Sequence, residues 1–207
     1  MQGPPCIRQG NRKAAENARK IAKQLSDFEN NVARAKAYIH QNLEKAEGYA
    51  YLASLYQQHS KIEQAIRQYR VALTVDPRFT PAYHHLAELY IQRRDLKQAT
   101  DVYRGALRQM PEDAQTRVML AQLYKERNQM KEAIEQLDIA QKLLEASVKQ
   151  GATIKHLEIL SLVYAAKGLY GKAEAVVKEM IKSAPNNPQY QNQLNAIRAA
   201  RRRERKR

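Results

Sequence analysis

The sequence is poor in the residues that build disulfide-bonded domains, nucleotide-binding loops and membrane spans. Among its 207 residues there is one cysteine, Cys6, no tryptophan, and only seven glycines, which are scattered. One cysteine excludes an internal disulfide, and scattered glycines exclude a glycine-rich loop that cradles phosphates. No apolar stretch approaches the roughly 18 residues of a membrane span, and the first six residues lack the apolar core of a signal peptide. We therefore expect a soluble, cytoplasmic chain, unless a longer parent protein supplies an upstream signal or anchor.

The residue sets that carry catalysis are also missing. There is no His-Glu-x-x-His motif and no cysteine pair, and no serine has a neighbouring His–Asp pair. His84 and His85 are adjacent, so on a helix their side chains point about 100° apart and do not readily share one metal ion. We therefore expect no enzyme activity, no cofactor and no metal site.

Acidic residues are few relative to basic ones, and the imbalance lies at the two ends of the chain. The formal net charge is +15, from 36 Lys and Arg against 21 Asp and Glu. Residues 46–187 are close to balanced, with 20 basic and 16 acidic residues, whereas 188–207 hold seven basic residues and one acidic residue. Such a basic run can bind phosphates or an anionic membrane surface, or it can be a solvated tail that keeps the protein soluble. The candidate anion-binding residues are Arg198, Arg201, Arg202, Arg203, Arg205, Lys206 and Arg207.

What the sequence does contain is a repeat of 34 residues. When the segments 46–79, 80–113 and 114–147 are written as rows, their bulky and small residues align. The aligned sets are Tyr49, Tyr83 and Arg117; Leu52, Leu86 and Leu120; Tyr56, Tyr90 and Tyr124; Ala65, Ala99 and Ala133; Tyr69, Tyr103 and Leu137; and Ala72, Ala106 and Ala140. A self-similar period of this length indicates a stacked array of small structural units.

Both halves of each copy have a helical period. Ala82, Leu86, Leu89 and Tyr90 recur at three- and four-residue steps, as one face of a helix requires. The aligned alanines allow the two helices of a copy to approach closely. A proline closes the first and the second copy and ends the second helix there. The third copy lacks this proline, so we expect its second helix to run long.

The rest of the chain is organised around these copies. A fourth copy at 154–187 follows a six-residue insertion at 148–153, within which Gly151 is expected to end the preceding helix. Tyr190, Leu194 and Ile197 have the spacing of a buried helix face. The remaining segments are predicted to be a disordered N-terminal segment at 1–11, a degenerate helical hairpin at 12–45, a capping helix at 188–200 and a basic tail at 201–207.

With these features the sequence resembles the tetratricopeptide repeat family. That family places a bulky aromatic residue, Leu, a small residue and Tyr on the first helix, then Ala, an aromatic residue, Ala and a closing Pro on the second. The copies at 46–79 and 80–113 fit the pattern nearly throughout, whereas the third departs at Arg117 and Leu137. The resemblance implies an all-α fold, an α-solenoid of stacked antiparallel helix pairs that forms a superhelix. A repeat family fixes architecture far better than function.

The resemblance also implies a binding surface, because the first helices of such arrays line a concave groove. The repeat frame places there Tyr51, Ser54, His84, His85, Glu88, Val118, Met119, Gln122, Glu158 and Ile159. An exposed tyrosine and a methionine suit an adaptable site for a peptide or a helix. Family members that bind heat-shock chaperones hold a terminal carboxylate with a clamp of Lys, Asn and Arg. The clamp positions hold Ala50 in one frame and Glu88 in another, so heat-shock chaperone C-terminal tails are disfavoured as partners.

Three hypotheses of function follow from these observations. The first is a non-enzymatic scaffold or adaptor that binds a peptide or helix of a protein partner in the groove and helps to assemble a multiprotein complex. The second is a binder of nucleic acid or an anionic membrane surface, which uses the basic termini. The third is the repeat module of a longer enzyme or secretion component. Self-association into a homo-oligomer stays open alongside all three.

Overall fold

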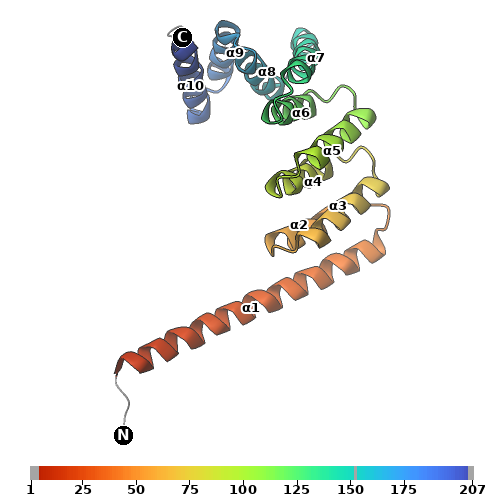
Figure 1. The fold of residues 1–207 in the computed structure, drawn as a ribbon, viewed down its shortest axis with the longest axis vertical. Coiled ribbons are helices and arrows are strands. Elements are labelled where there is room, and N and C mark those ends of the chain that lie inside the picture. Colours follow the sequence, from red (N-terminus) through yellow and green to blue (C-terminus); the bar gives the residue numbers. More distant parts are fainter. Residues whose placement is uncertain (1–4, 152, 205–207) are drawn as a thin grey trace. The chain divides into compact units, whose positions relative to one another are not determined.

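The computed structural model describes residues 5–151 and 153–204, with side chains from residue 16 onward. Within these residues the fold is all-α and consists of ten helices, packed as sequential antiparallel pairs (Figure 1). They are α1 (Pro5–Gln41), α2 (Ala46–Gln58), α3 (Ile62–Val75), α4 (Thr80–Gln92), α5 (Leu96–Gln109), α6 (Ala114–Glu126), α7 (Met130–Lys149), α8 (Ile154–Ala166), α9 (Tyr170–Ser183) and α10 (Pro188–Glu204). The predicted fold class is thereby confirmed.

The chain divides into two compact units, Met1–Leu86 and Ala87–Arg207, with the boundary inside α4. In the first unit α1 packs on α2, and α2 packs on α3. In the second unit each helix from α5 to α10 packs on the next, and α6 also touches α8.

Each first helix ends in the same turn. The residues Ser60, Arg94, Asn128 and Gly168 have φ between 56° and 75°, which is the left-handed region. In every case the amide of the following residue donates to the carbonyl of the tyrosine five positions back, at 2.8 or 2.9 Å. This is the Schellman arrangement, which satisfies carbonyls that the end of a helix leaves unpaired.

The second helices pack closely on the first ones through small residues. Ala65, Ala99, Ala133 and Ala173 are all fully buried, as close approach of two helices requires. The helix α7 has 20 residues, against 14 in α3, α5 and α9. The extension agrees with the missing proline, and it stops just before Gly151, whose φ is 97°.

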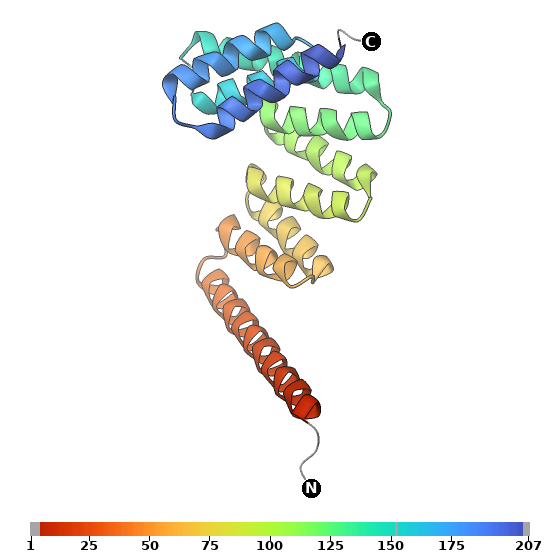
Figure 2. The same ribbon diagram turned by 90° about the vertical axis from the view of Figure 1, so that its left-hand side faces the viewer.

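The prediction for the N-terminal region is wrong, because 12–45 does not form a hairpin. Residues 12–41 belong to the single 37-residue helix α1, which extends well beyond α2 and α3 (Figure 2). The segment 11–41 has neither glycine nor proline, so no strong helix breaker interrupts the helical pattern there. The expected disorder at 1–11 is also wrong for residues 5–11, which are helical, while 1–4 lie outside the described residues.

The C-terminal helix is longer than predicted. Tyr190, Leu194 and Ile197 are buried, as the spacing indicates, and α10 packs beside α9 (Figure 2). However, α10 continues to Glu204 instead of ending at residue 200. Part of the predicted tail is therefore helical, and Arg205, Lys206 and Arg207 lie outside the described residues.

Candidate partner-binding surfaces

In the first unit, the predicted groove residues lie on α2 and α4. Tyr51 is 53% exposed, which is unusual for an aromatic residue in a fold that buries most of its tyrosines. Ser54 donates its hydroxyl to the carbonyl of Tyr51 at 2.8 Å. The ring of His85 stacks on that of Tyr69, with centroids 5.5 Å apart and planes 17° apart. His84, next to it, is half-buried. Of the predicted groove residues in this unit, Tyr51 therefore has the exposed aromatic side chain.

In the second unit, the predicted residues separate into exposed and buried ones. Glu88 and Gln122 are exposed, and Met119 and Ile159 are half-buried. Val118 is only 7% exposed, so its assignment to an open surface is wrong. The reason is that α6 contacts α5, α7 and α8, and a helix covered on three sides leaves a narrow exposed stripe.

Glu158 has a structural partner that the sequence pattern did not reveal. The Tyr190 hydroxyl on α10 donates to Glu158 Oε1 at 3.0 Å, and this hydrogen bond raises the pKa of Tyr190. Beside it, Gln193 Nε2 donates to Ser161 Oγ at 2.7 Å. These bonds hold α10 against α8, so the Glu158 carboxylate serves the attachment of the C-terminal helix.

A small cavity opens in the second unit where α6, α7 and α8 meet. Its volume is about 200 Å³, and its lining includes Leu143, Leu144 and Ile159 as apolar members. The polar lining residues are Glu112, Asp113, Gln115, Ser147, Lys155 and His156. Leu144 and Ser147 lie beyond the first 14 residues of α7, so the extension of this helix beyond the usual length builds one wall of the cavity together with Leu143.

The repeat frame placed Lys155 and Ile159 on this surface, but it missed His156 and the residues that α7 contributes. Among them, His156 Nδ1 accepts a hydrogen bond from the Thr153 amide at 3.3 Å and so closes the first turn of α8. The missing proline of the third copy was the available signal, because it predicted a longer α7. It did not show that the extra turns would reach α8.

The basic residues at the C-terminus are partly committed to the fold. Arg201 Nη1 lies 3.1 Å from Glu174 Oε1, and Arg198 Nε lies 3.6 Å from Glu174 Oε2. Because residues three apart share a helix face, α10 directs both guanidinium groups at one carboxylate of α9. Arg202 and Arg203 are exposed, and the other predicted anion-binding residues lie outside the described part of the chain.

The shifted pKa values in the second unit reflect burial and packing. Burial, together with the charge of Glu88, raises the pKa of Tyr103 to about 12. Burial and the hydrogen bond to Glu145 raise the pKa of Tyr164 to about 12. Both hydroxyls therefore stay protonated at neutral pH. Among the residues whose side chains the structure describes, no group of three or more His, Cys, Asp or Glu could hold a metal ion.

None of the helices in the described ranges is both long enough and apolar enough to cross a membrane.

The fold and its repeats are shared with known proteins. Three solved structures illustrate this. BtubC (BKLC) from P. vanneervenii is 18% identical, and the match covers 86% of this chain and 83% of BtubC with a TM-score of 0.59. A tetratricopeptide repeat protein from Parabacteroides merdae ATCC 43184 is 17% identical over 93% of this chain and 73% of its own, with a TM-score of 0.56. TTC0263, a thermophilic repeat protein of Thermus thermophilus, is 18% identical over 85% of this chain and 93% of its own, with a TM-score of 0.55.

At these identities the likeness concerns the fold alone, and no curated protein matches the chain in sequence. The repeat itself is matched directly. Two tetratricopeptide repeat profiles match the chain, one at residues 51–114 and the other at residues 92–146. The chain therefore belongs to the tetratricopeptide repeat family.

Proposed function

We propose that the protein is a non-enzymatic adaptor that binds a peptide or helix of a partner protein and helps to assemble a multiprotein complex. Tetratricopeptide repeat proteins are generally protein–protein interaction modules and typically non-catalytic, which supports this class of function. The observation that carries the proposal is the cavity of about 200 Å³ between α6, α7 and α8. It combines an apolar wall with a rim of polar groups, as binding sites for side chains commonly do.

The chemistry of the cavity indicates what a partner would place there. Leu143 and Ile159 offer apolar surface, while Glu112 and Lys155 on the rim carry opposite charges. A cavity of this size accepts one apolar side chain, and the rim pairs with polar groups on either side of it. We therefore propose a partner segment with one aliphatic or aromatic anchor flanked by polar residues. Met119 and Gln122 follow the lining residue Gln115 at four- and seven-residue steps on the same face of α6, and we propose that they contact the partner next to its anchor. Tyr51 gives the first unit a second, separate contact.

Chaperone tails remain disfavoured as partners. Binding of a terminal carboxylate requires several cationic or amide hydrogen-bond donors that converge on it. In the second unit the corresponding positions include Glu88, Met119 and Ile159, which offer a negative charge and apolar surface.

The alternative function, binding of nucleic acid or an anionic membrane through the basic tail, has less support. Arg198 and Arg201 both lie against Glu174, so two of the predicted anion-binding residues already have a carboxylate partner.

The proposal can be tested with peptides selected from a random display library on the intact chain. We expect selected peptides to share an apolar anchor, and the double substitution Met119→Ala with Ile159→Ala to weaken their binding at least about tenfold, measured by fluorescence anisotropy. Leu169→Ala, at the exposed turn between α8 and α9, is the matched control and should bind as the unmodified chain does. If the unmodified chain, the double variant and the Leu169→Ala control bind the peptides equally well, the cavity is not the binding site.

A further inference from the structure

One apolar stripe on α1 continues beyond the contact between α1 and α2. Residues 18, 21, 25, 28, 32, 35 and 39 alternate in steps of three and four, which is the heptad spacing of a coiled coil. In its C-terminal half, Phe28 and Ala35 form a buried cluster with Leu52 and Leu55, and Val32 and Ile39 pack against that cluster. Here the stripe is the surface that holds α2.

The N-terminal half of the same stripe is uncovered. The helix α2 ends near Phe28. The centroid of the Phe28 ring lies 4.1 Å from that of His59, the residue that follows α2. Beyond this point Ile21 is 64% exposed and Leu25 is 52% exposed. The hollow where the covered part gives way to the uncovered part has a volume of about 580 Å³, and Ile21, Leu25, Phe28 and His59 are among its lining residues.

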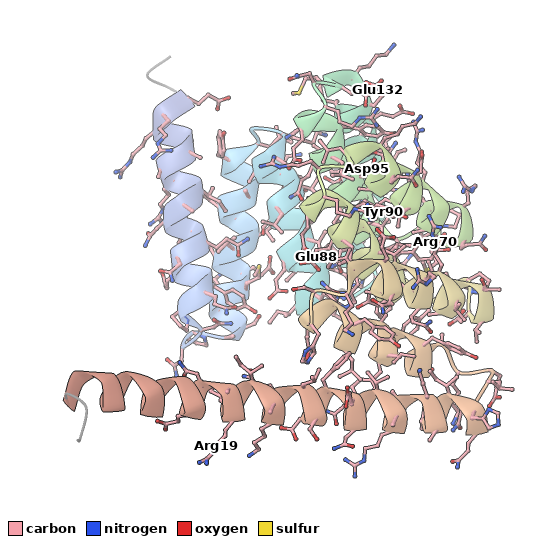
Figure 3. The ribbon with its side chains drawn as sticks, turned by 60° about the horizontal axis from the view of Figure 1, so that its bottom comes forward. Arg19, Arg70, Glu88, Tyr90, Asp95 and Glu132 are labelled. Carbon is pink, nitrogen blue, oxygen red and sulfur yellow. The ribbon has the colours of Figure 1, made fainter. Side chains whose placement is uncertain are left out.

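Charges on this part of α1 avoid the edges of the stripe. If Ala18 and Leu25 are a positions and Ile21 is a d position, the flanking e and g positions are Asn17, Ala22 and Gln24. Between residues 16 and 27 the charged residues fall at the outward b, c and f positions: Glu16, Arg19, Lys20, Lys23 and Asp27. Figure 3 shows Arg19 projecting from the side of α1 that faces away from α2 and α3.

We propose that a second copy of this chain covers the stripe, with the N-terminal halves of the two α1 helices packed antiparallel. The two helices cross where Ile21 of each copy lies against Ala18 of the other, so a large side chain meets a small one and the helices approach closely. Because they cross at an angle, the N-terminal turns of each α1 pass beside the α2 helix of the other copy and leave its contact with Phe28 and Ala35 in place. The stripe continues an existing helix–helix interface, which shows that its spacing suits a helix as the occupant. The flanks are amides and alanine, so two like-charged helices meet without direct repulsion across the seam.

The same observations disfavour other occupants. An acidic partner helix is selected by basic residues at the e and g positions, and a membrane-surface helix carries lysines beside its apolar face. Here Arg19, Lys20 and Lys23 lie at the outward positions, away from the stripe. A parallel pair would stack Ile21 on Ile21 and Ala18 on Ala18, and it would bring both copies of α2 to the same end.

Sedimentation velocity on the full chain tests the proposal. The expected result is a mass that rises with concentration from 23.8 kDa to twice that value. The double substitution Ile21→Asn with Leu25→Asn should raise the dissociation constant at least about tenfold, while circular dichroism stays unchanged because both side chains are exposed. Leu43→Asn, an equally exposed leucine off the stripe (59%), is the control and should dimerise normally. A monomer at about 100 μM, or a dimer that the double substitution leaves intact, overturns the proposal.

The orientation has its own test. In a Cys6→Ser background, a spin label at Lys36→Cys in each copy should give a distance of about 50 Å, since the labels are then 33 residues apart along the paired helices at about 1.5 Å per residue. Parallel helices would place the labels within about 25 Å of each other. A short distance in the dimer therefore rejects the antiparallel arrangement.

Discussion

At the scale of single residues, Arg117 shows how a departure from the repeat pattern keeps the same contact. Tyr49 donates its hydroxyl to the carbonyl of Leu43, and Tyr83 donates to that of Pro77, each six residues back. Arg117 stands at the aligned position of the third copy, and its Nε and Nη2 donate to the carbonyl of Pro111 at 3.2 and 2.6 Å. Burial lowers the pKa of this guanidinium, although the charge of Asp113 acts the other way. The guanidinium remains charged, and it satisfies the carbonyl that a tyrosine satisfies elsewhere.

The left-handed turn residues are a second case in which the same position holds different residues. Glycine adopts this region freely, whereas for a residue with a Cβ the conformation costs roughly 1–2 kcal/mol, and for asparagine less. Only the fourth copy has glycine, at Gly168; the others have Ser60, Arg94 and Asn128.

We therefore predict that Arg94→Gly raises the free energy of unfolding by about 0.5–1 kcal/mol, because relief of strain exceeds the added chain entropy of glycine. Asn128→Gly is the internal comparison and should change stability by less than about 0.3 kcal/mol. Urea denaturation followed by circular dichroism measures both values. If the two substitutions have equal effects, strain at the turn is not the cause.

At the scale of elements, the N-terminus of α6 is capped by both oxygens of one carboxylate. Asp113 Oδ1 accepts from the amides of Gln115 and Thr116 at 3.1 and 3.2 Å, and Oδ2 accepts from the Thr116 hydroxyl at 2.7 Å. At the start of α5, Asp95 accepts only from the amide of Gln98. Both carboxylates satisfy amides that a helix leaves unpaired.

We predict that Asp113→Ala lowers the free energy of unfolding by about 1–2 kcal/mol and that Asp95→Ala costs about 1 kcal/mol. Asp113→Asn keeps an acceptor at the cap, so it should recover most of the loss. Thermal unfolding of the three variants, measured beside the unmodified chain, gives the change in stability for each. A loss in the asparagine variant as large as in the alanine variant would show that charge, and not capping, dominates.

The elements α1 and α7 illustrate what local sequence can predict about helix length. The absence of proline after the third copy correctly predicts a long α7. The same reasoning should apply to α1, where 11–41 has no breaker, yet the repeat frame favoured a hairpin there. The continuous helix prevails because Phe28 and Ala35 on one straight face suffice to cover α2.

At the scale of the whole molecule, pH acts on carboxylates that join neighbouring helices. The Tyr164 hydrogen bond at 2.7 Å, followed by that from Gln141, lowers the pKa of Glu145. Burial raises the pKa of Glu174, but the hydrogen bond from Arg201 and the charges of Arg201 and Arg198 outweigh it and lower the pKa overall. A carboxyl group whose pKa is lower in the folded state adds stability above the unfolded pKa, and this contribution is lost as the pH falls.

We therefore predict that the stability of the chain declines as the pH falls below about 4.5, near the pKa of an unfolded glutamate. Replacing Glu174 by Gln should lower stability at pH 7 and make the decline with falling pH shallower, because the group no longer titrates. Urea midpoints at pH 7, 5 and 3.5 test this. If the urea midpoint of the Glu174→Gln variant falls with pH as steeply as that of the unmodified chain, the contact of Glu174 with Arg198 and Arg201 does not contribute to the pH dependence of stability.

The sequence alone determined the repeat, the helix pairs α2 to α9, the buried alanines and tyrosines, and the inward face of α10. These features follow from residues within one repeat, where three- and four-residue spacing directly encodes which side of a helix is apolar. The tertiary structure decided the burial of Val118, the bond between Tyr190 and Glu158, and the cavity beside α7. Each of these depends on which helix arrives from a neighbouring repeat and how far it reaches, and hydrophobic spacing within one helix carries no information about either.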